Sequence, residues 1–192
     1  MAHFKRLSNG ISALIAGGVG LVVFLWPRKT TKLDYITTQQ RDQWYGPIRY
    51  VPDPKPDNLE GIYIMNNFEP LNIVREEFPL IGRAAIHRVA APSLRKALTE
   101  IQRAGLGHYI KSYAGGFYPR FVRGSQSNLS SHSYGTSIDI NAGTNPQGQA
   151  PTAEQTALAP YFERNGWYWG DRFTSKRDPM HFEFVLPPKG IA

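Results

Sequence analysis

The sequence predicts an α+β fold, in which a sheet is flanked by helices and preceded by an N-terminal membrane helix. Two short stretches, residues 137–141 and 181–184, alternate apolar with polar side chains, as strands with one buried face do. Residues 87–104 instead place apolar side chains three and four positions apart, which is typical of an amphipathic helix. An uncharged run over residues 11–26 supplies the N-terminal helix.

The composition limits the classes of function. A chain of 192 residues can bury one proper core and still carry an additional segment. There is no cysteine, so disulfides and thiolate ligands are excluded, and any metal site must use histidine and carboxylates. Of the net charge of +7, residues 1–32 contribute +5, and residues 33–192 contribute only +2 from 17 basic and 15 acidic side chains. Since the larger part has no basic run with interleaved aromatic residues, we expect no nucleic-acid binding.

Residues 1–29 are predicted to be a hydrophobic anchor with basic flanks. The uncharged run spans about 24 Å as a helix, and a start at residue 7 lengthens it to about twenty residues, sufficient for a hydrocarbon core of roughly 30 Å. Phe24–Pro27 lacks the small residues that precede a signal-peptide cleavage site. The cationic flanks also fit poorly with a buried core helix. We therefore expect residues 7–26 to be an uncleaved membrane anchor.

Residues 30–60 are expected to be a linker, and residues 61–192 the folded domain. Prolines in the second half of the linker oppose regular secondary structure and favour an extended spacer: Pro47, Pro52, Pro54 and Pro56. Within the domain, residues 61–65 are predicted to be a short strand at its entrance. Residues 66–82 are expected to be loop.

The clearest predicted helix covers residues 87–104. Pro92 suits its first turn, and Gly105 suits its end. We expect a core helix without a catalytic role, and a structural rather than functional role for His87 at its edge. Residues 108–113 follow as a predicted strand.

A second helix is predicted to begin at the capping-box pattern Thr152-x-x-Gln155 and to end at Gly166. Pro160 is expected to kink this helix or to begin a second short one. The aromatic run at residues 167–169 comes next. It fits both a core and the wall of a groove, and the two alternatives stay open.

Two histidines and two aspartates near the predicted strands are candidates for a metal site. If the two strands share a sheet, Asp139 and His181 can project from the same face. His132 precedes Asp139 by seven residues and can return over that face through a turn eased by Gly135. With Asp178, these residues offer two imidazoles and two carboxylates, which can build a zinc site with one open position.

These residues form an ordered pair of motifs that resembles those of the D-alanyl-D-alanine metallopeptidases. That family includes the vancomycin-resistance D,D-dipeptidases and carboxypeptidases and the phage L-alanyl-D-glutamate endolysins. The matching residues are Ser130, His132, Gly135 and Asp139 in the first motif, and Asp178 and His181 in the second. Ser137 stands where the family usually has alanine. The resemblance covers roughly residues 81–186 and implies a hedgehog-like α+β domain with a small antiparallel sheet.

The resemblance implies that His132, Asp139 and His181 bind Zn²⁺ and leave a fourth position for water. It also places the general base at Asp178. In an extended chain the Cα atoms of Asp178 and His181 would lie about 10 Å apart, so a turn must bring this carboxylate back toward the metal. Pro179 excludes a helix at Asp178 and favours an extended or turned backbone there.

A Gly-aromatic-Arg stretch before the first motif resembles the place where family members carry a substrate-binding arginine. The resemblance implies this role for Arg120, with Arg123 as the rival, and both stay open. Such an arginine would clamp a carboxylate or stabilise an oxyanion. Glu183 shares the polar strand face with His181 and is either an acceptor that orients this imidazole or an exposed strand residue.

The resemblance implies a zinc peptidase that cuts D-residue-containing peptides of peptidoglycan, as a D-Ala-D-Ala carboxypeptidase or an L-Ala-D-Glu endopeptidase. Two alternatives stay open: a zinc-bearing binding module without activity, and a structural component of a phage particle or envelope complex. The presence of Asp178 favours the enzyme. We expect a monomer that acts on the stem peptide and is anchored in the membrane, with its catalytic domain facing the periplasm or cell wall.

Overall fold

The computed structural model describes residues 5–6, 12–13, 33–55, 60–188 and 190. The chain divides into two units, Met1–Lys32 and Leu33–Ala192. In the first unit, β1 (Lys5–Arg6) pairs antiparallel with β2 (Ser12–Ala13). Apart from Ser12 and Ala13, the membrane anchor predicted over residues 7–26 lies outside the described residues. None of the helices in the described ranges is both long and apolar enough to span a bilayer.

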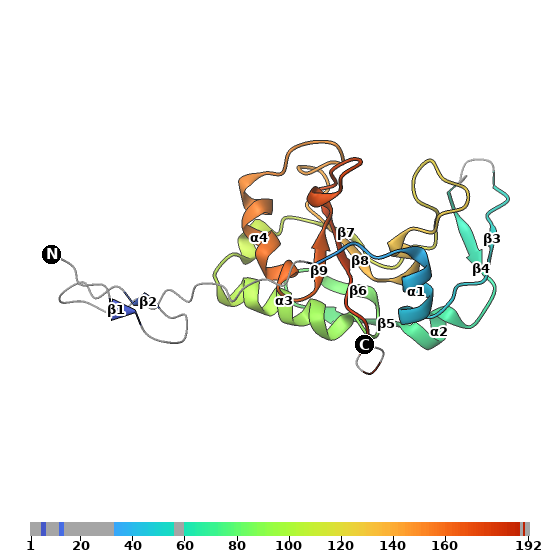
Figure 1. The fold of residues 1–192 in the computed structure, drawn as a ribbon, viewed down its shortest axis with the longest axis horizontal. Helices are drawn as coiled ribbons and strands as arrows, with labels where there is room; N and C mark the ends of the chain where they lie inside the picture. The colour runs from blue at the N-terminus through green and yellow to red at the C-terminus, as the bar shows by residue number, and fades with distance from the viewer. Residues whose placement is uncertain (1–4, 7–11, 14–32, 56–59, 189, 191–192) are drawn as a thin grey trace. The chain divides into compact units, whose positions relative to one another are not determined.

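The second unit is an α+β domain built on an antiparallel four-stranded sheet (Figure 1). The strands occur in the order β7 (Tyr113–Gly115), β8 (Ser137–Ile140), β10 (His181–Phe184) and β9 (Trp167–Trp169). The predicted strands at 137–141 and 181–184 therefore share a sheet, as neighbours. The small antiparallel sheet expected for this fold class is confirmed.

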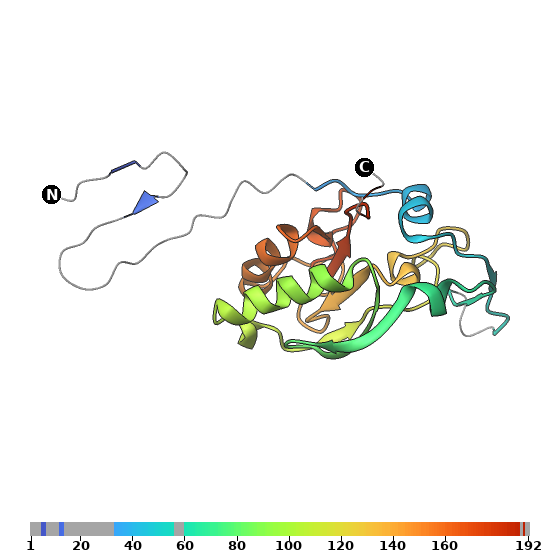
Figure 2. The same cartoon turned by 90° about the horizontal axis from the view of Figure 1, so that it is seen from below.

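Two helices pack beside this sheet, and both are predicted by the sequence. α3 (Ala91–Arg103) and α4 (Ala153–Glu163) lie side by side (Figure 2). The side chain of Thr152 accepts a hydrogen bond from the backbone N–H of Gln155, as the capping-box pattern predicts. Pro160 does not begin a second helix, because α4 continues through it to Glu163.

Hairpins fill most of the region before α3. β5 (Ile73–Phe78) pairs with β6 (Gly82–His87), and β3 (Tyr50–Pro52) pairs with β4 (Ile62–Ile64), which confirms the short strand expected near residue 62. The loop expected over residues 66–82 is wrong, because it contains α2 (Phe68–Asn72) and all of β5. Charged side chains in the middle of β5 are tolerated because they point toward solvent while both ends of the strand are buried.

The strand predicted over residues 108–113 is also wrong. A 3₁₀ turn, η1 (Gly107–Tyr109), comes first, and β7 begins only at Tyr113. Between them the backbone N–H groups of Lys111 and Ser112 both donate to Oδ1 of Asn141, at 2.7 and 3.1 Å. A side chain thus satisfies backbone groups that a strand partner would otherwise take.

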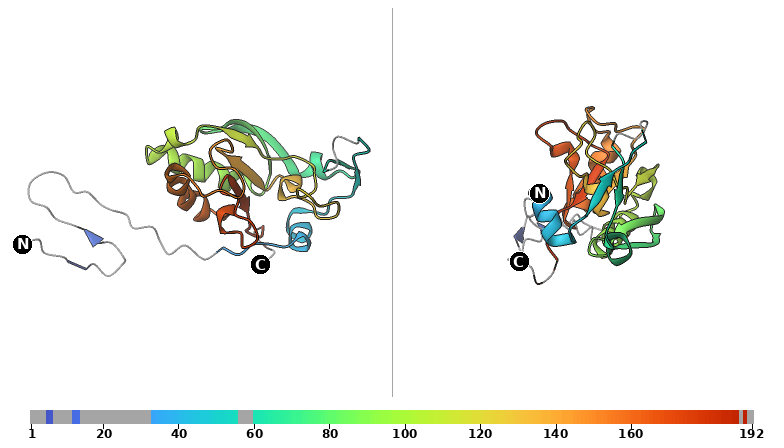
Figure 3. Two further views of the ribbon diagram at one scale, coloured as in Figure 1. Left: turned by 90° about the horizontal axis from the view of Figure 1, so that it is seen from above. Right: turned by 90° about the vertical axis from the view of Figure 1, so that its right-hand side faces the viewer.

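The linker expected over residues 30–60 is wrong for its described part. It contains α1 (Thr38–Tyr45), which begins with a complete capping box between Thr37 and Gln40. Arg41 and Tyr45 on this helix are buried. The hydroxyl of Tyr45 donates to the carbonyl oxygens of Phe184 and Leu186, at 3.1 and 3.0 Å, so α1 docks beside the end of β10 (Figure 3).

Candidate metal centre

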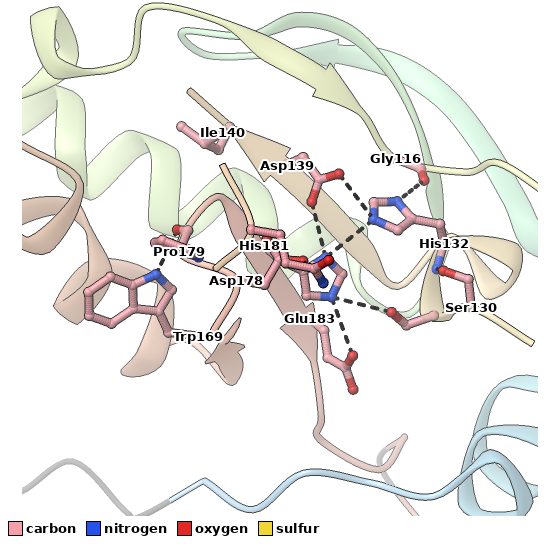
Figure 4. A network of polar contacts seen from close by, with 12 residues as sticks. Gly116, Ser130, His132, Asp139, Ile140, Trp169, Asp178, Pro179, His181 and Glu183 are labelled. Carbon is pink, nitrogen blue, oxygen red and sulfur yellow. Dashed lines mark hydrogen bonds and ion pairs between the residues drawn. The ribbon is translucent and has the colours of Figure 1, made fainter. Parts of the chain in front are cut away.

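Adjacent strands bring Asp139 and His181 together. Asp139 on β8 and His181 on β10 are register partners in the antiparallel sheet, so their side chains lie on one face (Figure 4). His132 reaches the same place from η2 (Ser131–Tyr134), a short 3₁₀ turn that precedes β8. The projection from one face that the alternating pattern predicted is therefore present.

The turn that carries His132 depends on glycine at position 135. Gly135 has φ of +66°, in the left-handed region. A Cβ atom there would also lie 2.7 Å from Cδ1 of Ile73 and 2.9 Å from the backbone nitrogen of His87. Since the carbonyl of Gly135 accepts from that same nitrogen at 2.8 Å, the turn is locked against β6.

The ends of three possible ligand side chains converge at this place, with both carboxylate oxygens of Asp139 facing the imidazoles. Nε2 of His132 lies 3.3 Å from Nδ1 of His181 and 3.3 Å from Oδ2 of Asp139, and Nδ1 of His181 lies 3.0 Å from Oδ1 of Asp139. Ligand atoms around a tetrahedral zinc with bonds of about 2.1 Å are roughly 3.4 Å apart. The spacing therefore fits a metal ion, and the group could hold one.

The outward-facing nitrogens of both imidazoles have acceptors. Nδ1 of His132 donates to the carbonyl of Gly116 at 2.8 Å. Nε2 of His181 faces Oε2 of Glu183 at 3.4 Å, with the hydroxyl of Ser131 also 3.4 Å away. Hydrogens on these outer nitrogens leave the inner lone pairs directed at the centre, which is the arrangement that metal-ligating histidines need.

The charges of the centre also fit a cation. Burial alone would lower the pKa of the His181 imidazole, but Asp139 and Glu183 raise it to about 10. Burial alone would raise the pKa of the Asp139 carboxyl, but His132 and His181 hold it well below its usual range. The acidic surroundings of His181 thus favour a positive charge, and a metal ion would compete with a proton for this imidazole.

The centre lies in the wall of a cleft of about 780 Å³. Besides His132, Asp139 and His181, the lining includes Arg120, Arg123, Gln147, Tyr168, Phe173 and Asp178. The two alternatives for the aromatic run both hold in part. Trp167 and Trp169 are buried in the core, whereas Tyr168 between them faces the cleft.

Asp178 comes to the cleft through the turn that its neighbouring proline favours. The N–H of His181 donates to the carbonyl of Asp178 at 3.1 Å, which closes a four-residue turn. The indole of Trp169 donates to the carbonyl of Pro179 at 2.8 Å (Figure 4). The side-chain amide of Gln155 donates to the same carbonyl at 2.9 Å, so two side chains hold this turn in place.

The carboxylate of Asp178 is only partly engaged. Its Oδ2 accepts from the side-chain amide of Gln147 at 3.2 Å. Its Oδ1 is buried and has no hydrogen-bond partner within the described part of the chain. Burial raises the pKa of this carboxyl, and the nearby charge of Asp139 adds to the rise. Such a carboxylate can accept a proton from a water molecule in the cleft.

Both candidate arginines line the cleft, so the choice between them stays open. Arg120 is half-buried, with its backbone N–H donating to the hydroxyl of Ser133 at 2.8 Å and its guanidinium donating to the carbonyl of Phe121 at 3.0 Å. Arg123 is exposed at the rim. The backbone of Arg120 is thus tied to the turn that carries His132.

Sequence reasoning missed the partners of Glu183 and Asp178. Glu183 is 2% exposed and forms an ion pair with Arg41, which lies within the expected linker. Gln147 lies in a loop without periodicity. The capping box of α1, Thr37-x-x-Gln40, is the local signal that could have identified the helix carrying Arg41.

Fold and site together define a class of protein: an α+β domain with two histidines and one aspartate that could hold a metal, and with a further carboxylate in the same cleft. Residues 123–184 match the family model described as D-alanyl-D-alanine carboxypeptidase. This match confirms, over these residues, the resemblance to the D-alanyl-D-alanine metallopeptidases that the two motifs indicated, and it supports a metallopeptidase. Comparisons with curated proteins and with solved structures found no significant match.

Proposed function

We propose that this chain is a zinc-dependent peptidase that hydrolyses peptide bonds in peptidoglycan stem peptides. The bond is the terminal D-Ala-D-Ala bond or the L-Ala-D-Glu bond. The observation that carries the proposal is the position of Asp178, which lines the same cleft as His132, Asp139 and His181 and has one carboxylate oxygen without a partner in the described chain. A family match to a D-alanyl-D-alanine carboxypeptidase over residues 123–184 supports the same reaction class.

Zinc suits this donor set best. Two imidazoles and one carboxylate are ligands of catalytic zinc sites that keep one position open. A zinc ion bound there acidifies a water molecule and polarises the carbonyl of the scissile bond. Asp178 accepts a proton from the attacking water and returns it to the leaving nitrogen, the usual work of a general acid/base.

An arginine at the cleft binds the substrate. Stem peptides of this kind carry carboxylate groups next to the bonds in question, and a guanidinium recognises a carboxylate through two parallel hydrogen bonds. Arg120 is the better candidate, since its backbone is held to the His132 turn while Arg123 is exposed. In this position Arg120 orients the peptide or stabilises the oxyanion.

Residues 7–26 are proposed to anchor the protein in the membrane, with the catalytic domain facing the periplasm or cell wall. The support is the uncharged run between basic flanks. We also propose that the protein acts as a monomer. Fractionation of cells that express the full chain tests the anchor, and recovery of the uncleaved chain in the soluble fraction would overturn it.

Mass spectrometry of purified muropeptides after incubation tests the activity, because the product masses identify the bond. Asp178→Asn keeps the shape of the side chain and the zinc ligands, so zinc should stay bound while the rate falls by roughly 10²–10⁴. His132→Ala should lose both zinc and activity. Near-normal turnover by Asp178→Asn would refute the role of Asp178 as general base. A zinc-loaded wild type that cuts no wall peptide would instead favour the binding module.

A further inference from the structure

Arg41 and Glu183 form an ion pair enclosed by protein. The two residues are 142 positions apart in sequence, and their side chains are only 3% and 2% exposed. The guanidinium of Arg41 donates to Oε1 of Glu183 at 2.5 Å. The cost of removing two charges from water offsets most of their attraction, so a buried pair of this kind contributes little net stability. Its location beside the metal centre indicates a role in orientation.

Glu183 uses its two carboxylate oxygens for different partners. Oε1 accepts from Arg41, whereas Oε2 lies 3.4 Å from Nε2 of His181. A hydrogen on Nε2 that points at this carboxylate leaves Nδ1 free to face Asp139 at 3.0 Å. The carboxylate therefore determines which nitrogen of His181 is available to a metal.

The two imidazoles differ in what orients them. Nδ1 of His132 donates to the carbonyl of Gly116, a backbone atom whose position the chain fixes. Nε2 of His181 faces two side chains with rotatable bonds, both at 3.4 Å: the hydroxyl of Ser131 and, as the stronger acceptor, the carboxylate side chain of Glu183. That side chain stays in place only if its other oxygen is held, and Arg41 holds it.

α1 has other attachments that do not involve His181. The hydroxyl of Tyr134 donates to Oδ1 of Asp42 at 2.5 Å, and the hydroxyl of Tyr45 donates to the carbonyl of Phe184 at 3.1 Å. Docking of the helix and orientation of His181 can therefore be separated by mutation.

We propose that Arg41 and Glu183 are positioning residues of the metal centre, which makes α1 a part of that centre. Arg41 holds the carboxylate of Glu183, the carboxylate holds Nε2–H of His181, and Nδ1 is thereby turned toward the metal. The proposal rests on the proposed binding of zinc by His132, Asp139 and His181. Neither Arg41 nor Glu183 is one of the three proposed zinc ligands, and Arg41 does not line the cleft. Arg41 also lies outside the segment 123–184 that matches the family.

The test is the zinc affinity of the full-length chain, measured by competition with a chelating dye. Arg41→Met removes the charge but keeps the length of the side chain, and should weaken zinc binding by about 10–100-fold, as loss of a partner behind a metal ligand does. Arg41→Lys keeps the charge and should restore much of the affinity. Asp42→Asn is the matched control on the same helix, because it removes the charge of the acceptor for Tyr134, weakens this docking hydrogen bond and leaves His181 untouched.

Thermal unfolding of each variant in EDTA separates positioning from stability. We expect Asp42→Asn to lower Tm slightly and yet to bind zinc like the wild type. Arg41→Met should lower Tm more, because it leaves the buried carboxylate of Glu183 without its cation, so zinc affinity is compared well below both values of Tm. Equal zinc affinity in Arg41→Met and the wild type would overturn the positioning role, and so would an equal loss of affinity in Asp42→Asn. If Arg41→Met does not fold, Arg41→Lys and Glu183→Gln decide by the same comparison. A wild type without zinc refutes the metal centre itself, whereas a zinc-loaded but inactive wild type refutes only the peptidase.

Discussion

Acidification should destabilise the folded unit through His87, which is buried as a neutral imidazole. This side chain is 1% exposed; its Nε2 donates to the carbonyl of Tyr45 at 2.9 Å, and its Nδ1 accepts from the N–H of Val89 at 3.2 Å. Protonation would place a hydrogen on Nδ1 directly against that N–H. Burial lowers the pKa of His87 to about 4, although the hydrogen bond to Tyr45 acts in the opposite direction.

The sign and size of the effect follow from the two pKa values. Between about pH 6.5 and 4 the unfolded chain binds a proton at His87 that the folded protein does not bind, so stability falls as the pH falls. The stabilisation that depends on neutral His87 is complete above the pKa of this side chain in the unfolded chain. It is lost as the pH falls toward its pKa in the folded protein. The difference corresponds to roughly 3 kcal/mol in total, of which about 2 kcal/mol is lost between pH 7 and pH 5.

Urea unfolding at pH 7, 6 and 5, followed by tryptophan fluorescence in EDTA, measures this loss. His87→Gln is the matched variant, because its amide can still donate toward Tyr45 but does not titrate. It loses ring contacts with Tyr45 and Phe68, at centroid distances of 5.4 and 6.0 Å, a cost that does not depend on pH. The wild type should lose about 2 kcal/mol more than His87→Gln between pH 7 and pH 5. Parallel pH dependences in the two proteins would refute the reasoning.

Three further substitutions test the packing and the ligands. Ser137→Ala removes a fully buried hydroxyl without a hydrogen-bond partner in the described chain, and should raise stability by about 1 kcal/mol and Tm by about 3 °C; a lower Tm would contradict this. Gly135→Ala should destabilise by at least about 2 kcal/mol, since its left-handed φ and the contacts of a Cβ atom both oppose it, and an unchanged urea midpoint would contradict the turn geometry. His181→Ala should lose zinc in elemental analysis, whereas His108→Ala, outside the centre, should keep it. Equal zinc content in the two variants would contradict the assignment of His181 as a ligand.

The parts of the fold that the sequence predicts well are those in which one local pattern decides the outcome. Alternation over residues 137–141 specifies which side chains of β8 share a face, and the same pattern in β10 specifies the position of His181, although the polar faces of both strands are largely buried as well. Once the strands pair in register, Asp139 and His181 must share a face. Gly135 is equally local, because its left-handed φ excludes most other residues at that position.

The errors arise where the partner of a segment is distant in sequence. The backbone at residues 111–112 has strand-like neighbours, yet its N–H groups are taken by the side chain of Asn141. β5 carries three charged residues in a row, which locally resembles a loop, and becomes a strand because β6 pairs with it over its whole length. Neither Asn141 nor the pairing with β6 can be inferred from the segment that it orders.

α1 combines both kinds of information. Its capping box is a local signal and could have been detected, as the equivalent pattern was at Thr152. The burial of this helix could not have been predicted, because a helix with so few apolar residues lacks the amphipathic pattern that indicates a core position. Polar contacts dock α1 instead: an ion pair with Glu183, and hydrogen bonds with Tyr134 and with the end of β10.

The dependence on partners distant in sequence also affects the candidate site, at Glu183. The alternation of β10 places it on the face of His181 but leaves two readings, an acceptor for the imidazole or an exposed strand residue. Burial at 2% exposure removes the second reading, and burial of a carboxylate requires a cation. That cation is Arg41, in the segment whose prolines suggested a linker. The orientation of one proposed zinc ligand thus depends on a helix that lies well before the family motifs, which is why the motifs alone could locate the ligands but not explain what holds His181 in place.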